Sequence, residues 1–316
     1  SLKNNNKNNN NNNNMNSKKN GNVKIEYIQI PTPSVGGSNI VGIILLLVFI
    51  LAFIGSSYWL YNYYNQQTFI KSLCDRNFGV GSDGVLWRNH KEQYGLRIFN
   101  PDGSEAEKSG NGLRIFAKYC LDNLNAPNQF IINLPTTKVL ATSKNETHTL
   151  IEIEMGSPTF KSEDVGVLTE EQEYFQKPLL VEETEMLAHA VSVGNPHCIF
   201  IVDNPTTQLA KKIGPLVENH PIFKNRTNVQ FAKQLDNENI KIEIWERGAG
   251  YTLASGTSSC AVASVFKKLN LIENKVNILM PGGKIEIRFE GENIFMTGEV
   301  NAVFSAELTT EFLKNF

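Results

Sequence analysis

The sequence predicts an α/β (α+β) fold for residues 66–316, on two observations. Short β-like runs, each bounded by turn residues, recur along this part of the chain. Two segments with apolar residues at helical spacing interrupt these runs, and each segment follows a glycine-rich turn. The runs are 129–133, 150–154, 240–245 and 284–289, and the helical segments begin at Gly110 and near Thr257.

Composition supports a globular core and excludes one class of partner. The chain has 316 residues, of which 41% are hydrophobic, with 30 basic and 32 acidic side chains. Residues 1–24 carry five lysines and no acidic residue, which leaves 25 basic and 32 acidic residues, or −7, for the rest. A folded part of that sign is not expected to bind nucleic acid. The four cysteines lack the spacing of a metal site or a disulfide framework, so we expect no metal and a reduced compartment.

Residues 1–38 are predicted to be a low-complexity tail and linker. Asparagine supplies 13 of the first 22 residues and lysine most of the interruptions. Such a polar tract buries too little apolar surface to offset the entropy of ordering its backbone, so we expect it to be disordered.

Residues 39–64 are predicted to form a transmembrane helix. No charged residue occurs from Tyr27 to Ile70, and the 21 residues 40–60 are long enough, at about 1.5 Å each, to cross about 30 Å of hydrocarbon. An aromatic cluster at 58–64 stands where an interfacial belt would lie. A buried core helix and a signal-peptide core are the alternatives. Flanking lysines lean slightly toward a cytosolic N-terminus.

Two matching turns precede the two helical segments. Ser109-Gly110-Asn111-Gly112 leads into the first and Ser255-Gly256-Thr257-Ser258 into the second, which suggests an internal duplication. The free N–H groups of two facing helix starts could grip one carboxylate from both sides. The alternative is that Ser109 and Ser255 are ordinary N-cap residues.

Longer strings around these turns point to a family. They are CDRNFGVGSDG at 74–84, RIFNPDGSEAEKSGNGLRIFAKY at 97–119, VSVGNPHCIF at 191–200, HPIFKNRTNVQF at 220–231, WERGAGYTLASGTSSCA at 245–261, MPGG at 280–283 and MTG at 296–298. Over residues 69–307 the chain resembles the diaminopimelate epimerase family. The resemblance implies two pseudo-symmetric, β-barrel-like domains, each around a central helix. Domain 1 would be 66–152 plus 300–316, and domain 2 would be 153–299.

The resemblance also implies a reaction and a site. Family members interconvert LL- and meso-diaminopimelate in lysine biosynthesis without a cofactor, and two cysteines transfer the Cα proton. Those cysteines correspond here to the candidate catalytic residues Ser109 and Ser255. The implied substrate-binding residues are Asn100, Gly110, Asn111, Asn195, Asn228, Glu246, Arg247, Gly256 and Thr257, with His197 as a pocket histidine.

Each of these assignments has a plainer alternative. The asparagines could serve as turn residues, Glu246 and Arg247 could form a solvated ion pair, and His197 could be a structural group. Cys260, more than a helical turn beyond Ser255, is predicted to be a core cysteine. Two departures from the family also stand out. Tyr251 replaces its usual glutamate, and residues 23–68 lack its N-terminal Gly-Asn-Asp-Phe element.

Three functional hypotheses follow. The first is a diaminopimelate epimerase-like isomerase that is weakly active or inactive, because both proton-transfer cysteines are serine. The second is a non-catalytic amino-acid-binding or membrane-tethered scaffold protein. The third is a changed enzyme in which His197 activates one of the serines. The expected partners are a small amino acid such as diaminopimelate and a membrane contacted through residues 40–60, and a homodimer is left open. Although the flanking charges favour the opposite topology, we expect a single-pass protein with its domain in the cytosol, because a sugar at the sequon Asn225-Arg226-Thr227 would lie beside Asn228 of the implied substrate site. If residues 40–60 are a gene-model artefact, we expect a cytoplasmic protein.

Overall fold

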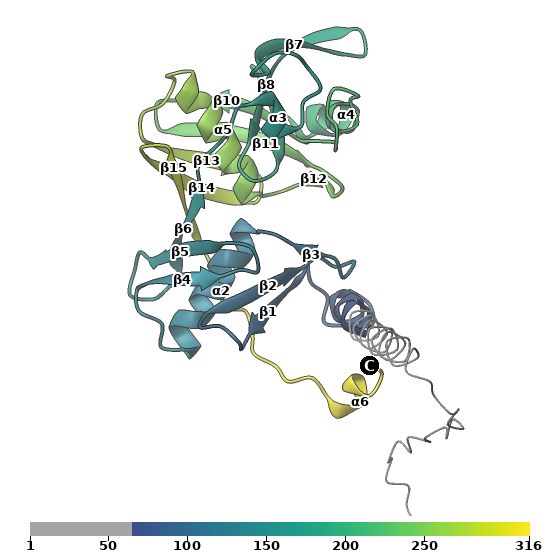
Figure 1. Cartoon of the computed structure of the whole chain (residues 1–316), viewed down its shortest axis with the longest axis vertical. Helices are drawn as coiled ribbons and strands as arrows, with labels where there is room; N and C mark the ends of the chain where they lie inside the picture. Colours follow the sequence, from purple (N-terminus) through teal and green to yellow (C-terminus); the bar gives the residue numbers. More distant parts are fainter. Residues whose placement is uncertain (1–64) are drawn as a thin grey trace, which may run out of the picture. The chain divides into compact units, whose positions relative to one another are not determined.

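The computed structural model describes residues 65–316 (Figure 1). The predicted tail at 1–38 and the predicted transmembrane helix at 39–64 lie outside the described residues, so both stay predictions. Among residues 65–316, none of the helices combines the length and the apolar character that a membrane crossing requires.

The first strands occupy residues 85–156. Along the strands at 129–133 and 138–143, alternating burial places one face in the core and the other toward solvent, as the period of two in a half-buried strand requires. They are β1 (Val85–Asn89), β2 (Gly95–Phe99), β3 (Glu105–Ala106), β4 (Gln129–Asn133), β5 (Lys138–Ser143) and β6 (Leu150–Gly156).

The later strands occupy residues 175–299. Several are rich in valine, isoleucine and phenylalanine, which suit a pleated and buried surface. They are β7 (Phe175–Val181), β8 (Thr184–Ser192), β9 (Pro196–Ile201), β10 (Asn228–Gln234), β11 (Asn239–Glu246), β12 (Gly250–Thr252), β13 (Lys275–Met280), β14 (Gly283–Glu290) and β15 (Asn293–Glu299).

All these strands belong to one continuous mixed sheet. Its order is β1-β2-β4-β5-β6-β15-β14-β13-β11-β10-β9-β8-β7, with β3 beside β2 and β12 beside β11. The last strand, β15, pairs with β6 through residues such as Met296 and Ile153, and so joins the two series of strands. The predicted domain boundary at residue 152 therefore falls inside β6.

Two buried helices carry the turns identified in the sequence. Helix α2 (Gly110–Asn123) packs on β5 and β6, and helix α5 (Gly256–Lys268) packs on β8, β9, β10 and β14. Figure 1 shows each helix beside its own series of strands. Both helices were predicted from their apolar spacing, and both are confirmed, as are the four predicted β-like runs.

Four further helical segments lie outside this pair in the described chain. They are α3 (Ser162–Val165), α4 (Thr207–Glu218) and α6 (Thr310–Leu313), together with residues 65–74. The C-terminal segment packs on the helix at residues 65–74, where Phe69 contacts both Phe312 and Phe316 edge to face.

The largest hydrophobic cluster draws on both series of strands and on both central helices. Leu113 and Phe116 of α2 belong to it, as do Val262 and Phe266 of α5. A second cluster lies between α4 and strands β7 to β10, with Phe200 stacked on Phe231. The two central helices therefore start from positions that one shared core holds in place.

Candidate functional site

Ser109 and Ser255 are the N-cap residues of α2 and α5. Each has an extended backbone, and its hydroxyl oxygen accepts a hydrogen bond from a first-turn amide: Ser109 Oγ from Gly112 N at 3.2 Å, and Ser255 Oγ from Ser258 N at 3.4 Å. The capping alternative is therefore confirmed for both serines. The N–H groups of Gly110, Asn111, Gly256 and Thr257 have no acceptor among the described residues. Such groups are free to bind an anion.

The two helix starts meet at Met296 of β15. A Cβ atom added to Gly110 would lie 2.8 Å from Met296 Cε and 3.5 Å from the Cα of Gly256. One added to Gly256 would lie 2.7 Å from Met296 Sδ and 3.4 Å from the Cα of Gly110. A side chain at either position would therefore have to displace the end of the buried Met296 side chain, and glycine avoids this at both helix starts.

His197 lies fully buried on β9, near the start of α5. Its Nε2 donates to Asn195 Oδ1 at 2.9 Å, and its Nδ1 has no partner in the described chain. Burial lowers the pKa of His197 to about 3; the Gln230 side chain partly offsets this, and Arg247 lowers it further. The ring is therefore neutral at pH 7. No hydrogen bond within residues 65–316 joins it to Ser109 or Ser255.

Gln230 connects His197 to the first turn of α5. Its Nε2 donates to Ser258 Oγ at 3.0 Å, while its Oε1 has no hydrogen-bond partner although the amide lies beside the His197 ring. Two unpaired acceptors, Gln230 Oε1 and His197 Nδ1, thus lie close together. Rotating the amide by half a turn would let Nε2 donate to the ring and Oε1 accept from Ser258, which satisfies both groups.

Asn228 links three loops at one end of the second series of strands. Its Nδ2 donates to Pro196 O at 2.8 Å, and its Oδ1 accepts from Arg247 N at 2.9 Å. The Arg247 guanidinium donates to Asn225 O at 3.1 Å. The structure therefore brings Asn195, Asn228 and Arg247 together with His197.

Glu246 ends β11 beside this group. Burial raises its pKa, and a hydrogen bond from the Thr252 side chain opposes that rise. No salt bridge within residues 65–316 joins Glu246 to Arg247, so the alternative of a strand-end ion pair is not seen there.

Asn100 differs from the other asparagines. Its hydrogen bonds stay within its own turn between β2 and β3, where Nδ2 donates to Ser104 Oγ at 2.9 Å. These contacts fit the turn alternative, and no described hydrogen bond connects Asn100 to either helix start.

The amino-acid sequence of this chain is similar to those of known proteins. The family model described as diaminopimelate epimerase matches residues 61–161 and 189–303. Diaminopimelate epimerase 2 of Nostoc sp. is 46% identical over 247 residues, which cover 77% of this chain and 86% of that protein. The chain belongs to the diaminopimelate epimerase family.

Other matches agree with that assignment. A diaminopimelate epimerase of Carboxydothermus hydrogenoformans is 37% identical, over 77% of this chain and 89% of that protein. A solved structure titled as a probable proline racemase from Agrobacterium radiobacter shares the fold. Its TM-score is 0.56 at 12% identity, over 77% of this chain and 81% of that one. The α/β fold predicted from the sequence is thereby confirmed.

The structure also places Tyr251, the departure from the family noted above, and two residues close to the helix starts, Lys108 and Cys260. Tyr251 donates its hydroxyl to Glu243 Oε2 at 2.7 Å and lies 3.1 Å from Thr207 Oγ1 at the start of α4. Lys108 donates to Met155 O at 2.8 Å, and burial lowers its pKa. Cys260 is fully buried within α5, as predicted for a core cysteine.

Sequence reasoning missed Glu218, at the end of α4. This buried carboxylate accepts from Arg226 Nη1 and Gly248 N through Oε1, both at 2.8 Å, and from Trp245 Nε1 through Oε2 at 2.7 Å. It therefore holds the turn that carries Glu246 and Arg247. No local pattern marks such a residue, because its partners are far away in sequence.

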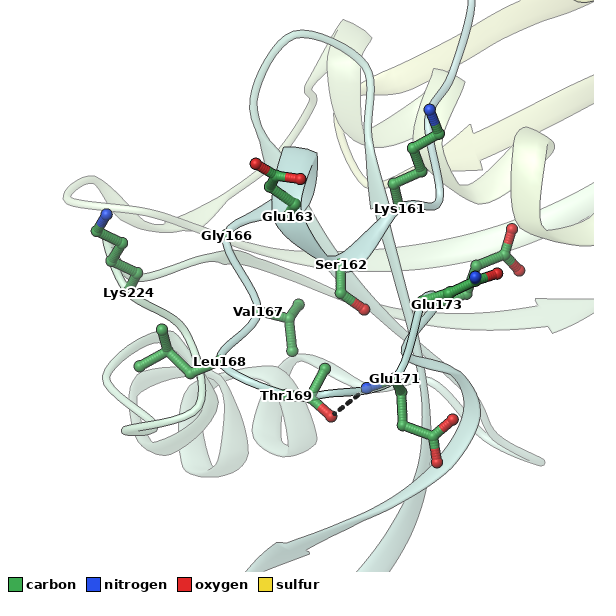
Figure 2. Close-up of a pocket in the computed structure, with 11 residues that line it drawn as sticks. Lys161, Ser162, Glu163, Gly166, Val167, Leu168, Thr169, Glu171, Glu173 and Lys224 are labelled. Atoms are coloured by element: carbon green, nitrogen blue, oxygen red, sulfur yellow. Dashed lines mark hydrogen bonds between the residues drawn. The ribbon is translucent and has the colours of Figure 1, made fainter.

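A separate cavity lies away from these residues. Its volume is about 770 Å³, and buried Ser162, with no partner for its Oγ in the described chain, lines it (Figure 2). Figure 2 also shows the hydrogen bond from Glu171 N to Thr169 Oγ1 at its rim. None of the predicted site residues lines this cavity.

Proposed function

We propose that this member of the diaminopimelate epimerase family binds an amino acid such as diaminopimelate at the paired starts of α2 and α5. We propose further that it epimerises the amino acid weakly or not at all. The observation that carries the proposal is the meeting of the two helix starts at Met296, with four amides left free. Two positive helix ends that face one space favour a carboxylate there.

We expect this chain to transfer the Cα proton poorly. Epimerisation needs one group to remove the Cα proton and another to return a proton on the opposite face. A thiol titrates near 8.5, whereas a hydroxyl similar to that of water titrates roughly 7 units higher, a difference on the order of 10 kcal/mol for forming the base. A helix start supplies about 0.3–2 kcal/mol. Ser109 and Ser255 therefore cannot act as the two thiols do.

His197 offers little help to either serine. A ring whose pKa is about 3 is a weak base, and no hydrogen bond within residues 65–316 joins it to either hydroxyl. This supports the weakly active or inactive isomerase over the changed enzyme in which His197 activates a serine.

The far end of the ligand would lie against the loops that Asn228 links. In this proposal Asn195, Asn228, Glu246 and Arg247 hold its distal amino-acid group, and Gly110, Asn111, Gly256 and Thr257 hold the carboxylate at the helix starts. Asn100 would contribute only if its turn moved, since its side chain is bonded within that turn. The proposal also includes three features of the whole chain. They are pseudo-symmetry between the two domains, assembly into a homodimer, and anchoring in a membrane through residues 40–60.

Incubation with LL- or meso-diaminopimelate in deuterated water tests the activity. We expect no Cα exchange above a no-protein control, while calorimetry detects binding at millimolar concentration or below. Exchange that disappears in Ser109→Ala or Ser255→Ala would contradict the loss of catalysis. Absence of binding for both stereoisomers would favour the alternative, a membrane-tethered scaffold protein.

A further inference from the structure

Arg114 of α2 is a buried cation without an anionic partner in the described chain. Only 7% of its surface is exposed. Its Nη2 donates to Asn111 Oδ1 at 2.8 Å, its Nη1 contacts Gly110 O and Met296 Sδ at 3.5 Å, and its Nε has no partner. No carboxylate lies within salt-bridge distance of it among residues 65–316. A buried charge is costly when nothing neutralises it.

The nearby thiol does not neutralise this charge. Burial raises the pKa of Cys260 to about 12, even though Lys108 and Arg114 lie close enough to lower it. Cys260 therefore stays protonated at pH 7. The positive charge of Arg114 adds to the two positive helix ends, and no described anion balances the three.

Strand β15 passes close to the Arg114 guanidinium at Gly298. A Cβ atom added to Gly298 would lie 3.0 Å from Arg114 Nε and 3.1 Å from its Cζ, so the glycine makes room for the arginine. On the same strand Met296 touches Gly110, Gly256 and Arg114. The guanidinium thus contacts the same methionine on which the two helix starts meet.

We propose that Arg114 is a positioning residue of the carboxylate cradle, fixing Gly110 and Asn111 and supplying the positive charge that a bound amino-acid carboxylate neutralises. The inference rests on the proposed function, because it concerns the same cradle. Arg288 differs from Arg114 in having a carboxylate partner, Glu152. Replacing a lone buried charge by an apolar side chain is often neutral or stabilising.

The test compares three variants of the full-length chain with the unchanged chain. Calorimetry gives the dissociation constant for meso-diaminopimelate, and thermal unfolding without ligand gives the midpoint. We expect Arg114→Met to weaken binding tenfold or more, with an unchanged or higher midpoint. Arg114→Lys should recover part of the affinity because it keeps the charge. The matched control Arg288→Met should lower the midpoint, since it removes one of the two cations that pair with buried Glu152 and leaves only Lys144 and the Thr297 hydroxyl as its partners, and it should keep the affinity within twofold.

If diaminopimelate binds, two results would overturn the inference. One is binding by Arg114→Met within twofold of the unchanged chain. The other is a fall in its midpoint as large as that of Arg288→Met, which indicates a purely structural role. If the unchanged chain binds no diaminopimelate, the proposed function fails, and acetate then tests Arg114 alone. Acetate should raise the midpoint relative to chloride at equal ionic strength, and Arg114→Met should abolish that rise. No rise in the unchanged chain would also overturn the inference.

Discussion

Glu218→Gln is expected to loosen the turn that carries Glu246 and Arg247. The carboxylate accepts from the Trp245 indole, the Gly248 amide and the Arg226 guanidinium, and its side chain is only 6% exposed. Glutamine keeps one acceptor oxygen and replaces the other with an NH₂ group. A donor then faces either the indole N–H or the backbone N–H, and that hydrogen bond is lost.

The size of the effect follows from these contacts. A buried donor left without an acceptor costs about 1–3 kcal/mol. The Arg226 pair adds less than about 1 kcal/mol, because the arginine side chain is 53% exposed and therefore screened by solvent. We expect a loss of about 2 kcal/mol in the free energy of unfolding, or about 4–8 °C for a domain of this size.

Urea denaturation of the full-length chain measures this loss. Glu171→Gln is the matched control, since its pair with Lys177 is exposed and should be worth less than about 0.5 kcal/mol. In a Trp245→Phe background the penalty of Glu218→Gln should shrink by about 1 kcal/mol, because the facing indole donor is gone. A Glu218→Gln chain as stable as the control variant, or equal penalties in both backgrounds, would refute the reasoning.

Three further outcomes are expected. Burial lowers the pKa of His197 from 6.5 in the unfolded chain to about 3 in the folded one. Between about pH 3 and 6.5 the unfolded chain therefore binds a proton at His197 that the folded chain does not. The contribution of neutral His197 is complete above about pH 6.5 and is lost as the pH falls toward 3. Urea midpoints should therefore fall less steeply with acidification in His197→Gln, and identical slopes would contradict this. Gly214→Ala places a Cβ atom 2.4 Å from Trp245 Cγ and should cost about 1–3 kcal/mol in urea unfolding, with relief in a Trp245→Leu background. Ser109→Cys with Ser255→Cys should restore Cα exchange in deuterated water only partly, because residues 23–68 lack the family's N-terminal element; exchange at the rate of an active relative would show that element to be dispensable.

Local patterns in the sequence predicted the parts of the fold that local forces decide. The apolar spacing and serine caps of α2 and α5 are readable within each segment, and both helices begin where expected. Helix α4 was not predicted, because Gly214 and Pro215 inside it argue against a helix. It forms because Gly214 allows close packing against Trp245, a residue that lies on another element.

The candidate site shows the same division. Ser109 and Ser255 are visible from the sequence, since a capping residue and its amide lie three positions apart. Glu218 and Gln230 bond to residues far along the chain, and Arg114 contacts Met296 of β15 in addition to two residues of its own helix. No periodicity reveals such distant pairs. The short strands β3 and β12 also depend on pairing partners rather than on propensity.

The pairing of β6 with β15 has a consequence during synthesis of the chain. All of residues 157–292 emerge from the ribosome after β6 and before its neighbour β15 is made. During that interval one edge of β6 has no partner, and unpaired strand edges invite association with other chains. Contacts between such distant segments also form slowly. We therefore expect the nascent first part to depend on chaperones until β15 is translated and completes the sheet.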